Sequence, residues 1–383
     1  IGKRAVSFRN YKLNNPIDNE YFKPIQKNVL TENAYGRDEI FWNQARHQQL
    51  SKVETNIYQM ADSIQKVPAF KRAMKIAGLF LFGYSEFGTF EIGPVNTFYS
   101  FNPVEGLRLR LGGRTMAKLN PRLYFETYMA YGFKDERWKG FGALTYNLGK
   151  NSIYEFPNNY LRVSYQDEVR IPGQELQFVQ EDNFLLSFKR GVNDKMTYNK
   201  VLRVDYRKES RSGISYEIGL KNLSQEAAGS LTFEKVGKLD GIPITDKSVT
   251  STELSFNLRF APNEQFYQGK NYRIPIINKY PIFQARYTLG IANILNSGYN
   301  FHNITLRANK RFFISPIGYT DVTAEGGRIF GKVPYPLLMI HRANQSYSYQ
   351  LESYNLMNFL EFVSDRYVAV NIDHNFNGFF LNK

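Results

Sequence analysis

The residues best suited to chemistry in this chain are four histidines and many serines, in a sequence without cysteine. No two of His47, His302, His341 and His374 have the spacing of metal ligands, and without thiolates a structural zinc site is not expected. His374 follows Asp373, so a Ser-His-Asp arrangement stays open on residue counts. However, no Gly-x-Ser-x-Gly elbow is present. We therefore predict no catalytic residue, no metal site and no cofactor, with a hydrolase kept as an alternative.

Charged residues form a second candidate site, because they recur at alternate positions of many short segments. Both signs are interleaved, and salt bridges such as Arg122 with Glu126, or Arg259 with Glu253, would brace the space that these residues line. We favour this braced interior over an ion- or solute-selective pore, which stays the alternative. The predicted set comprises Arg108, Arg110, Arg122, Glu126, Arg162, Glu168, Arg203, Asp205, Arg207, Glu217, Glu253, Arg259, Arg286 and Arg307.

The residues between these charges are apolar. A period of two predicts strands with two unlike faces. Runs of roughly 9–11 residues that are apolar on one face and charged on the other are typical of membrane-spanning β-barrels. We predict that the charged set lines a lumen and that the apolar set faces lipid; the latter comprises Leu123, Phe125, Met129, Leu161, Val163, Leu254, Phe256 and Leu258.

The alternation runs from about Thr89 to the last residue and predicts the fold class. We expect an all-β transmembrane antiparallel β-barrel of roughly 14–16 strands. A soluble all-β protein with an aromatic core is the alternative, but a sandwich buries its apolar faces within about 200 residues. The expected strands lie near 89–98, 106–115, 121–133, 140–148, 160–170, 196–208, 212–222, 248–261, 280–291, 299–310, 318–328, 356–363 and 366–376, with less regular candidates near 183–189, 229–236 and 346–354.

The chain divides into three parts by its pattern. Residues 1–37 lack periodicity and are predicted to form an extended arm, residues 38–87 a helical periplasmic or interfacial segment, and residues 88–383 the barrel. No closing strand is evident after Phe380, so the pattern leaves open whether the barrel is complete at Lys383.

The middle part has the spacing of an amphipathic helix. Apolar residues from Val53 to Ile64 recur every three or four positions, which predicts one helix over 38–66 that packs on a neighbouring protein. Val67-Pro68 should end it. The basic and apolar residues of 69–87 suit either an interfacial helix on the membrane or a lead-in to the first strand.

The charge balance bounds the partners. The net charge is +14, which suits an anionic surface. The Lys and Arg residues are spread along the chain rather than gathered in one run. We therefore expect outer-membrane lipid and lipopolysaccharide as the counter-charge, and no nucleic acid.

Several ordered motifs between residues 38 and 383 resemble a known family. Phe90-Glu91-Ile92-Gly93-Pro94 and the segments 99–115, 131–139, 359–367 and 376–383 resemble Bacteroidota proteins of unknown function that fuse a carboxypeptidase-regulatory-like domain to a membrane barrel. The Asn-Pro-x-Glu-Gly-Leu-Arg segment at 102–108 is similar, more distantly, to the surface-antigen barrels of BamA and TamA, which insert or export proteins. The resemblance implies the bacterial outer membrane as the location and supplies no reaction.

These observations together predict a role. We favour a non-enzymatic barrel that acts in outer-membrane protein assembly or secretion as a component of a larger envelope complex. Its expected partners are other outer-membrane or periplasmic proteins, a BamA-type complex among them. A solute or nutrient pore is the alternative, and a barrel-borne hydrolase is the second alternative.

Overall fold

The computed structural model describes residues 37–150, 152–173, 189–236, 243–268, 273–314, 316–347 and 349–380, together with residues 8, 11–14, 16 and 26–29. Most of the predicted arm 1–37, and nearly all of the strand candidate near 183–189, lie outside the described residues. The described part of the chain is dominated by one 14-stranded sheet in which every neighbouring pair is antiparallel.

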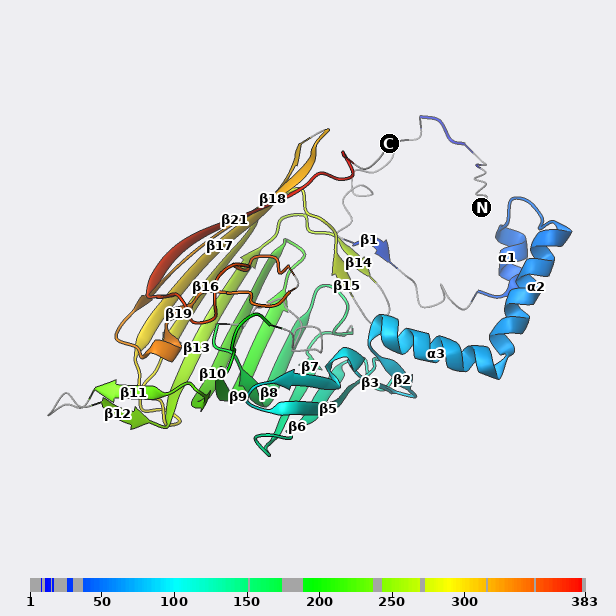
Figure 1. Ribbon diagram of the computed structural model, residues 1–383. Coiled ribbons are helices and arrows are strands. Elements are labelled where there is room, and N and C mark those ends of the chain that lie inside the picture. Colours follow the sequence, from blue (N-terminus) through cyan, green and yellow to red (C-terminus); the bar gives the residue numbers. More distant parts are fainter. Residues whose placement is uncertain are drawn as a thin grey trace.

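The sheet follows the order of the chain, so that consecutive long strands are hydrogen-bonded neighbours (Figure 1). Beside its main path, β4 (Tyr99–Asn102) pairs with β5. The main path runs through β2 (Ser85–Phe87), β3 (Phe90–Ile92), β5 (Gly106–Thr115), β6 (Leu123–Gly132), β7 (Trp138–Asn147), β8 (Asn159–Arg170), β9 (Lys195–Glu209), β10 (Ile214–Gly229), β13 (Ser248–Phe260), β16 (Ile282–Gly290), β17 (Phe301–Ile314), β18 (Gly318–Phe330) and β21 (Arg366–Asn375).

The period-two pattern explains the two faces of this sheet. Because side chains alternate across a strand, residues in register share a face. Val204, Leu220, Leu254 and Leu289 are in register on β9, β10, β13 and β16 and form one apolar row. One position along, Arg203, Lys221 and Glu253 form a charged row on the other face.

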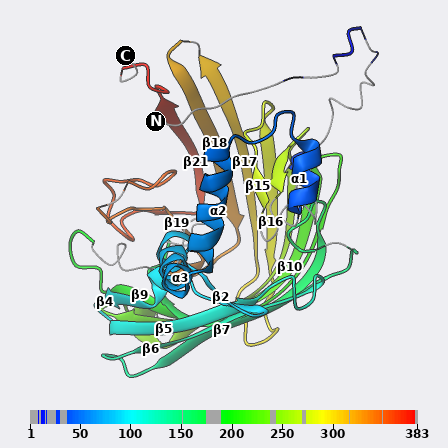
Figure 2. The ribbon, with the colours of Figure 1, turned by 90° about the vertical axis from the view of Figure 1, so that its right-hand side faces the viewer.

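The sheet is strongly curved, and its first and last strands form two separate edges (Figures 1 and 2). Among the described residues, no pairing joins β21 to β2. The structure therefore shows an antiparallel sheet with two edges, whereas the closed barrel expected from the sequence is not shown. Residues 331–362, which include β19 (Met339–Ile340), lie within the open side of the curve (Figure 2).

Some predicted strands are absent or differ in extent. Residues 346, 347, 349–354 and 356–362 form turns, irregular backbone and isolated bridges, and β20 (Val363–Ser364) follows them. Positive φ angles at Glu352 (56°) and Leu360 (63°) turn the backbone away from an extended path there. The strand expected at 89–98 is interrupted by a 3₁₀ turn at Val95–Thr97. The candidate near 229–236 is reduced to β11 (Phe233–Val236), which forms a hairpin with β12 (Pro243–Asp246).

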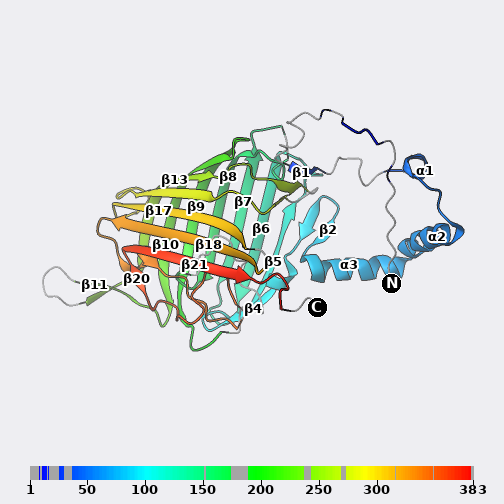
Figure 3. The same cartoon turned by 90° about the horizontal axis from the view of Figure 1, so that it is seen from above.

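Three helices precede the sheet and stand to one side of it (Figures 1 and 3). They are α1 (Glu39–Ala45), α2 (Lys52–Lys66) and α3 (Pro68–Phe82). The single helix predicted over 38–66 is therefore wrong. The second helix begins at Lys52 and is capped by Ser51, whose hydroxyl accepts the Glu54 N–H while the Glu54 carboxylate accepts the Ser51 N–H. None of the described helices combines the length and the hydropathy needed to cross a membrane.

Two further features lie against the polar face. A short sheet joins β1 (Gln26–Val29), β14 (Phe266–Gln268) and β15 (Arg273–Pro275), with β1 parallel to β14. A small apolar core at one end of the sheet contains Val169, Ile171, Met196 and Ala228, and Phe359 from the 331–362 segment packs against it. Polar pairs and this segment therefore lie on the inner side of the curve.

Candidate functional site

One face of the sheet is apolar and exposed. The whole predicted lipid-facing set lies on it, and its members are 37–60% exposed: Leu123, Phe125, Met129, Leu161, Val163, Leu254, Phe256 and Leu258. An exposed apolar surface of this extent marks contact with a membrane or with another protein. Contact with lipid remains a prediction.

The opposite face holds the predicted charged set. By strand parity its members share this face, and each has an ion-pair, hydrogen-bond or ring partner: Arg108, Arg110, Arg122, Glu126, Arg162, Glu168, Arg203, Asp205, Arg207, Glu217, Glu253, Arg259, Arg286 and Arg307. The charges of this face are therefore engaged by partners within the same chain.

The partners differ from those expected along single strands. Glu126 pairs with Arg162 on a neighbouring part of the sheet rather than with Arg122. Arg259 finds its carboxylate beyond the end of its own strand rather than at Glu253. Residues four or six apart on one strand are separated by about 13–20 Å, which keeps the two expected pairs apart. Residues two apart on one strand do pair, as Arg203 does with Asp205.

A first buried cluster lies where β4 turns into β5. The Lys139 Nζ is 2.6 Å from Glu105 Oε1 and 2.6 Å from Asp135 Oδ2. The Arg108 Nη2 is 2.6 Å from Glu168 Oε2. Glu105, Arg108 and Lys139 are only 2–4% exposed, and burial raises the pKa of the Glu105 carboxyl despite the opposing charge of Arg108. We call these five residues the turn cluster.

A second cluster ties the 331–362 segment to the sheet. The Glu325 carboxylate on β18 accepts hydrogen bonds from Arg342 at 2.9 Å and from the Tyr367 hydroxyl at 2.5 Å. The Arg307 Nη2 on β17 lies 2.6 Å from Glu352 Oε1. We call these five residues the segment cluster; it joins three strands, β17, β18 and β21, to two points of one covering segment.

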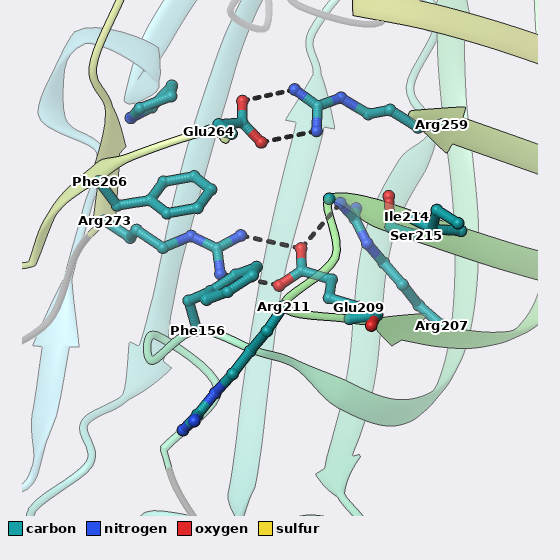
Figure 4. A pocket seen from close by; sticks show the side chains of 13 residues that line it. Phe156, Arg207, Glu209, Arg211, Ile214, Ser215, Arg259, Glu264, Phe266 and Arg273 are labelled. Atoms are coloured by element: carbon teal, nitrogen blue, oxygen red, sulfur yellow. Dashed lines mark hydrogen bonds and ion pairs between the residues drawn. The ribbon is translucent and has the colours of Figure 1, made fainter. Parts of the chain in front are cut away.

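A cavity of about 210 Å³ opens between β9, β10 and the β14–β15 sheet (Figure 4). The Glu209 carboxylate accepts two hydrogen bonds from Arg273, at 2.8 and 2.9 Å, and one from Arg207 at 3.2 Å. Arg259 binds Glu264 through two hydrogen bonds of 2.7 and 2.6 Å. Both carboxylates of the cavity are thus engaged by guanidinium groups.

Aromatic rings hold one of these guanidinium groups in place. The Arg273 Cζ lies 4.5 Å from the Phe266 ring centre and 5.6 Å from that of Phe156. Glu209 also accepts the backbone N–H of Asn158 at 3.0 Å. This arrangement fastens β15 to the end of β9, which is a structural role.

Residues 82–383 match the model of a family of unknown function (DUF5686), C-terminal domain. The chain belongs to this family. Among curated proteins, none matches the chain. Of the solved structures, that of BamA from Haemophilus ducreyi lacking POTRA domains 1–3 is similar at a TM-score of 0.38 and 11% identity, over 68% of this chain and 45% of that chain. The expected Bacteroidota origin and fused regulatory-like domain remain predictions.

The histidines of this DUF5686 domain contact hydroxyl groups. The His341 Nε2 lies 2.5 Å from the Ser364 Oγ, while His302 contacts Tyr287 at 2.7 Å. Burial, with Arg342 nearby, lowers the pKa of His341. Within the described ranges, no three His, Asp or Glu side chains are grouped as metal ligands. Two contacts in the described part of the chain have the form of a base beside a hydroxyl nucleophile: His341 with Ser364, and His374 with Thr320 at 2.8 Å.

Several charged residues of these clusters were not in the predicted set. Glu105, Lys139, Glu209 and Arg273 lie in turns or at strand ends, where the alternation that selected the others is weakest. Glu209 could have been found, because it continues the odd-numbered positions of Arg203, Asp205 and Arg207. Arg273 is placed by tertiary pairing of a three-residue strand and carries no such signal.

Proposed function

We propose that this DUF5686 domain is an outer-membrane β-barrel that acts without catalysis, as a component of an envelope complex for outer-membrane protein assembly or secretion. The observation that carries the proposal is the continuous apolar face, on which large side chains from β5 to β21 are exposed. Lipid accepts such a face, but unpaired backbone groups at sheet edges are costly there. The proposal therefore includes closure of the β2 and β21 edges in the membrane.

The location has a direct test. Cells that express the protein are separated into soluble periplasm and outer membrane, and the protein is run on a gel with and without heating. We expect it in the outer-membrane fraction with migration that changes on heating. Recovery in the soluble periplasm, with heat-independent migration, contradicts the proposal.

The helices support a role beside other proteins. No residue of α1 or α2 is buried. On α2, Val53, Ile57, Met60 and Ile64 form a stripe of which each member is 40–69% exposed. A stripe at this spacing is the form in which an amphipathic helix docks on a partner. We propose that it binds a periplasmic or outer-membrane protein of the complex.

This role is tested by purification in mild detergent. Ile57→Glu should remove the co-purifying proteins while the barrel stays folded and in the membrane. Gln59→Glu adds the same charge to the same helix on the face away from the stripe and is the matched control. If the wild-type protein purifies alone, and its depletion leaves other outer-membrane proteins at normal levels, the proposed role fails.

A solute pore is the alternative, which the charged face favours. Against it, the segment cluster holds residues 331–362 across that face through Arg307, Glu325, Arg342 and Glu352. Planar-bilayer conductance separates the two functions. Silent bilayers are expected for the wild-type protein, and stable channels of porin size would favour the transporter.

A hydrolase is the second alternative, because His341 and Ser364 are in hydrogen-bond contact. No carboxylate among the described residues completes a triad at the His341 Nδ1. Lipase and protease assays on the wild-type protein and on Ser364→Ala decide this point. Activity that disappears in the variant would establish the hydrolase, and we expect no activity in either.

A further inference from the structure

A groove interrupts the apolar face between β13 and β21. It has a volume of about 460 Å³, in the range of small-molecule sites. Its floor is made by small residues on the three strands β16, β17 and β18, namely Ala285, Ala308, Ala324 and Gly326. The outward positions of β10 and β13 instead carry the larger residues leucine, isoleucine and phenylalanine. Large side chains form its walls, among them Leu258, Phe260, Phe283, Leu306 and Val368.

Two arginines lie at one end of this groove. Arg328 on β18 and Arg366 on β21 are direct partners in register. Arg328 lies two positions after the groove residue Gly326, and Arg366 lies two positions before the groove residue Val368. Each arginine therefore points to the same face as its groove residue, with the two Cα atoms roughly 7 Å apart. Both side chains are exposed. Basic residues therefore stand directly beyond an apolar groove.

These two charges have no acidic partner in the described part of the chain. Arg328 lies 4.6 Å over the Phe330 ring, and no carboxylate forms an ion pair with Arg328 or Arg366. The next residue in their row is Ile304, which is neutral. Like charges placed directly opposite each other on a sheet destabilise it. An anion between them would remove this repulsion, and guanidinium pairs suit the oxygens of a phosphate.

We propose that this part of the apolar face binds one phospholipid of net negative charge, with its phosphate on Arg328 and Arg366 and one acyl chain in the groove. This inference rests on the proposed membrane location. It assigns a binding site to a face that would otherwise meet lipid without selection. Arginine charge and the apolar groove are both required, because a free phosphate would gain nothing from the groove.

The test uses the full chain in nanodiscs of phosphatidylcholine with and without phosphatidylglycerol, and counts the retained lipids by native mass spectrometry. We expect preferential retention of one phosphatidylglycerol molecule. Arg328→Gln together with Arg366→Gln should weaken it by roughly tenfold or more, since each charged hydrogen bond contributes on that scale. Lys310→Gln, which removes an outward charge at the other end of the groove beside Phe312, should leave retention unchanged.

A second variant separates a lipid site from a phosphate site. Ala324→Phe fills the floor of the groove and should reduce phosphatidylglycerol retention, while binding of soluble glycerol phosphate stays as weak as before. Equal retention by the wild-type protein and the double arginine variant overturns the inference. Loss of retention in Lys310→Gln alone also overturns it, as does tight binding of glycerol phosphate that Ala324→Phe leaves unchanged.

Insertion is measured first, by resistance of the protein to carbonate extraction from vesicles. A protein that inserts but shows no preference for phosphatidylglycerol leaves the proposed location standing and refutes the lipid site. A protein that does not insert refutes the location itself. The two failures are therefore distinguishable.

Discussion

The turn cluster and the segment cluster lie on the same charged face but differ in what they join. In the turn cluster, Glu105, Arg108 and Lys139 are 2–4% exposed and connect neighbouring strands and turns of the sheet itself. In the segment cluster, Glu325 and Glu352 keep side-chain exposures of 13% and 25% and connect the sheet to a covering segment.

The difference shows that ion pairs on one face can serve two purposes. Charges as buried as those of Glu105, Arg108 and Lys139 are costly to leave unpaired, so we expect the loss of a partner there to destabilise the fold. Charges that keep contact with water can separate at a small cost, so the segment cluster can open without unfolding the sheet. We expect substitutions in the two clusters to differ in size and in kind.

The largest effect should follow from Lys139→Met. This change leaves Glu105 and Asp135 without their 2.6 Å partner in a buried site. Removal of one member of a buried ion pair costs about 3–5 kcal/mol of unfolding free energy. Urea unfolding in lipid vesicles measures it. Lys118→Met is the control, because the Lys118–Glu86 pair is exposed and should contribute less than about 1 kcal/mol.

Equal effects of Lys139→Met and Lys118→Met would show that burial does not distinguish the turn cluster.

The opposite face supplies a reference that is independent of ion pairs. Phe256 lies in the apolar row of β13 and is 43% exposed. Phe256→Arg should lower the unfolding free energy in vesicles by roughly 2–4 kcal/mol if this row is near the membrane midplane. Phe256→Leu keeps the apolar character and should change it little. A tolerated arginine would show that this row does not lie near a membrane midplane.

The two faces illustrate what the sequence can predict. Alternation on β13 assigns Leu254, Phe256 and Leu258 to one face and Glu253 and Arg259 to the other, because parity along a strand requires no knowledge of its neighbours. Ion-pair partners need the register between strands and the loops above them. For this reason the face of Glu253 could be predicted, but its partner Lys221 could not.

Irregular segments were the least predictable for a similar reason. Residues 346–354 have residues suited to a strand, but Asn344 and Asn355 satisfy backbone groups there through side-chain hydrogen bonds. The break between α1 and α2 depends on reciprocal hydrogen bonds of Ser51 and Glu54, a local signal that a hydrophobic stripe does not contain. Closure of the sheet has no local signal at all.

A smaller effect is expected from Glu352→Gln in the segment cluster. The change removes the charge that pairs with Arg307 at 2.6 Å and Arg342 at 3.6 Å. We expect about 1 kcal/mol of local destabilisation, and therefore roughly fivefold faster protease cleavage within 331–362. The unfolding free energy of the sheet should stay near that of the wild-type protein. If the unfolding free energy of the sheet also fell by about 1 kcal/mol, the segment and the sheet would unfold together.

The smallest effect should be a pH dependence of the same segment. Burial, aided by Arg342, lowers the pKa of His341 below its ordinary value of 6.5. In the window between the folded and unfolded pKa values the unfolded segment binds more protons, so stability rises with pH there and levels off above about 6.5. Acidification through this window should therefore speed cleavage within 331–362. His341→Gln keeps a hydrogen-bonding side chain near Ser364 but does not titrate. Cleavage of this variant should be independent of pH across the window, and an unchanged pH dependence would assign the effect to another group.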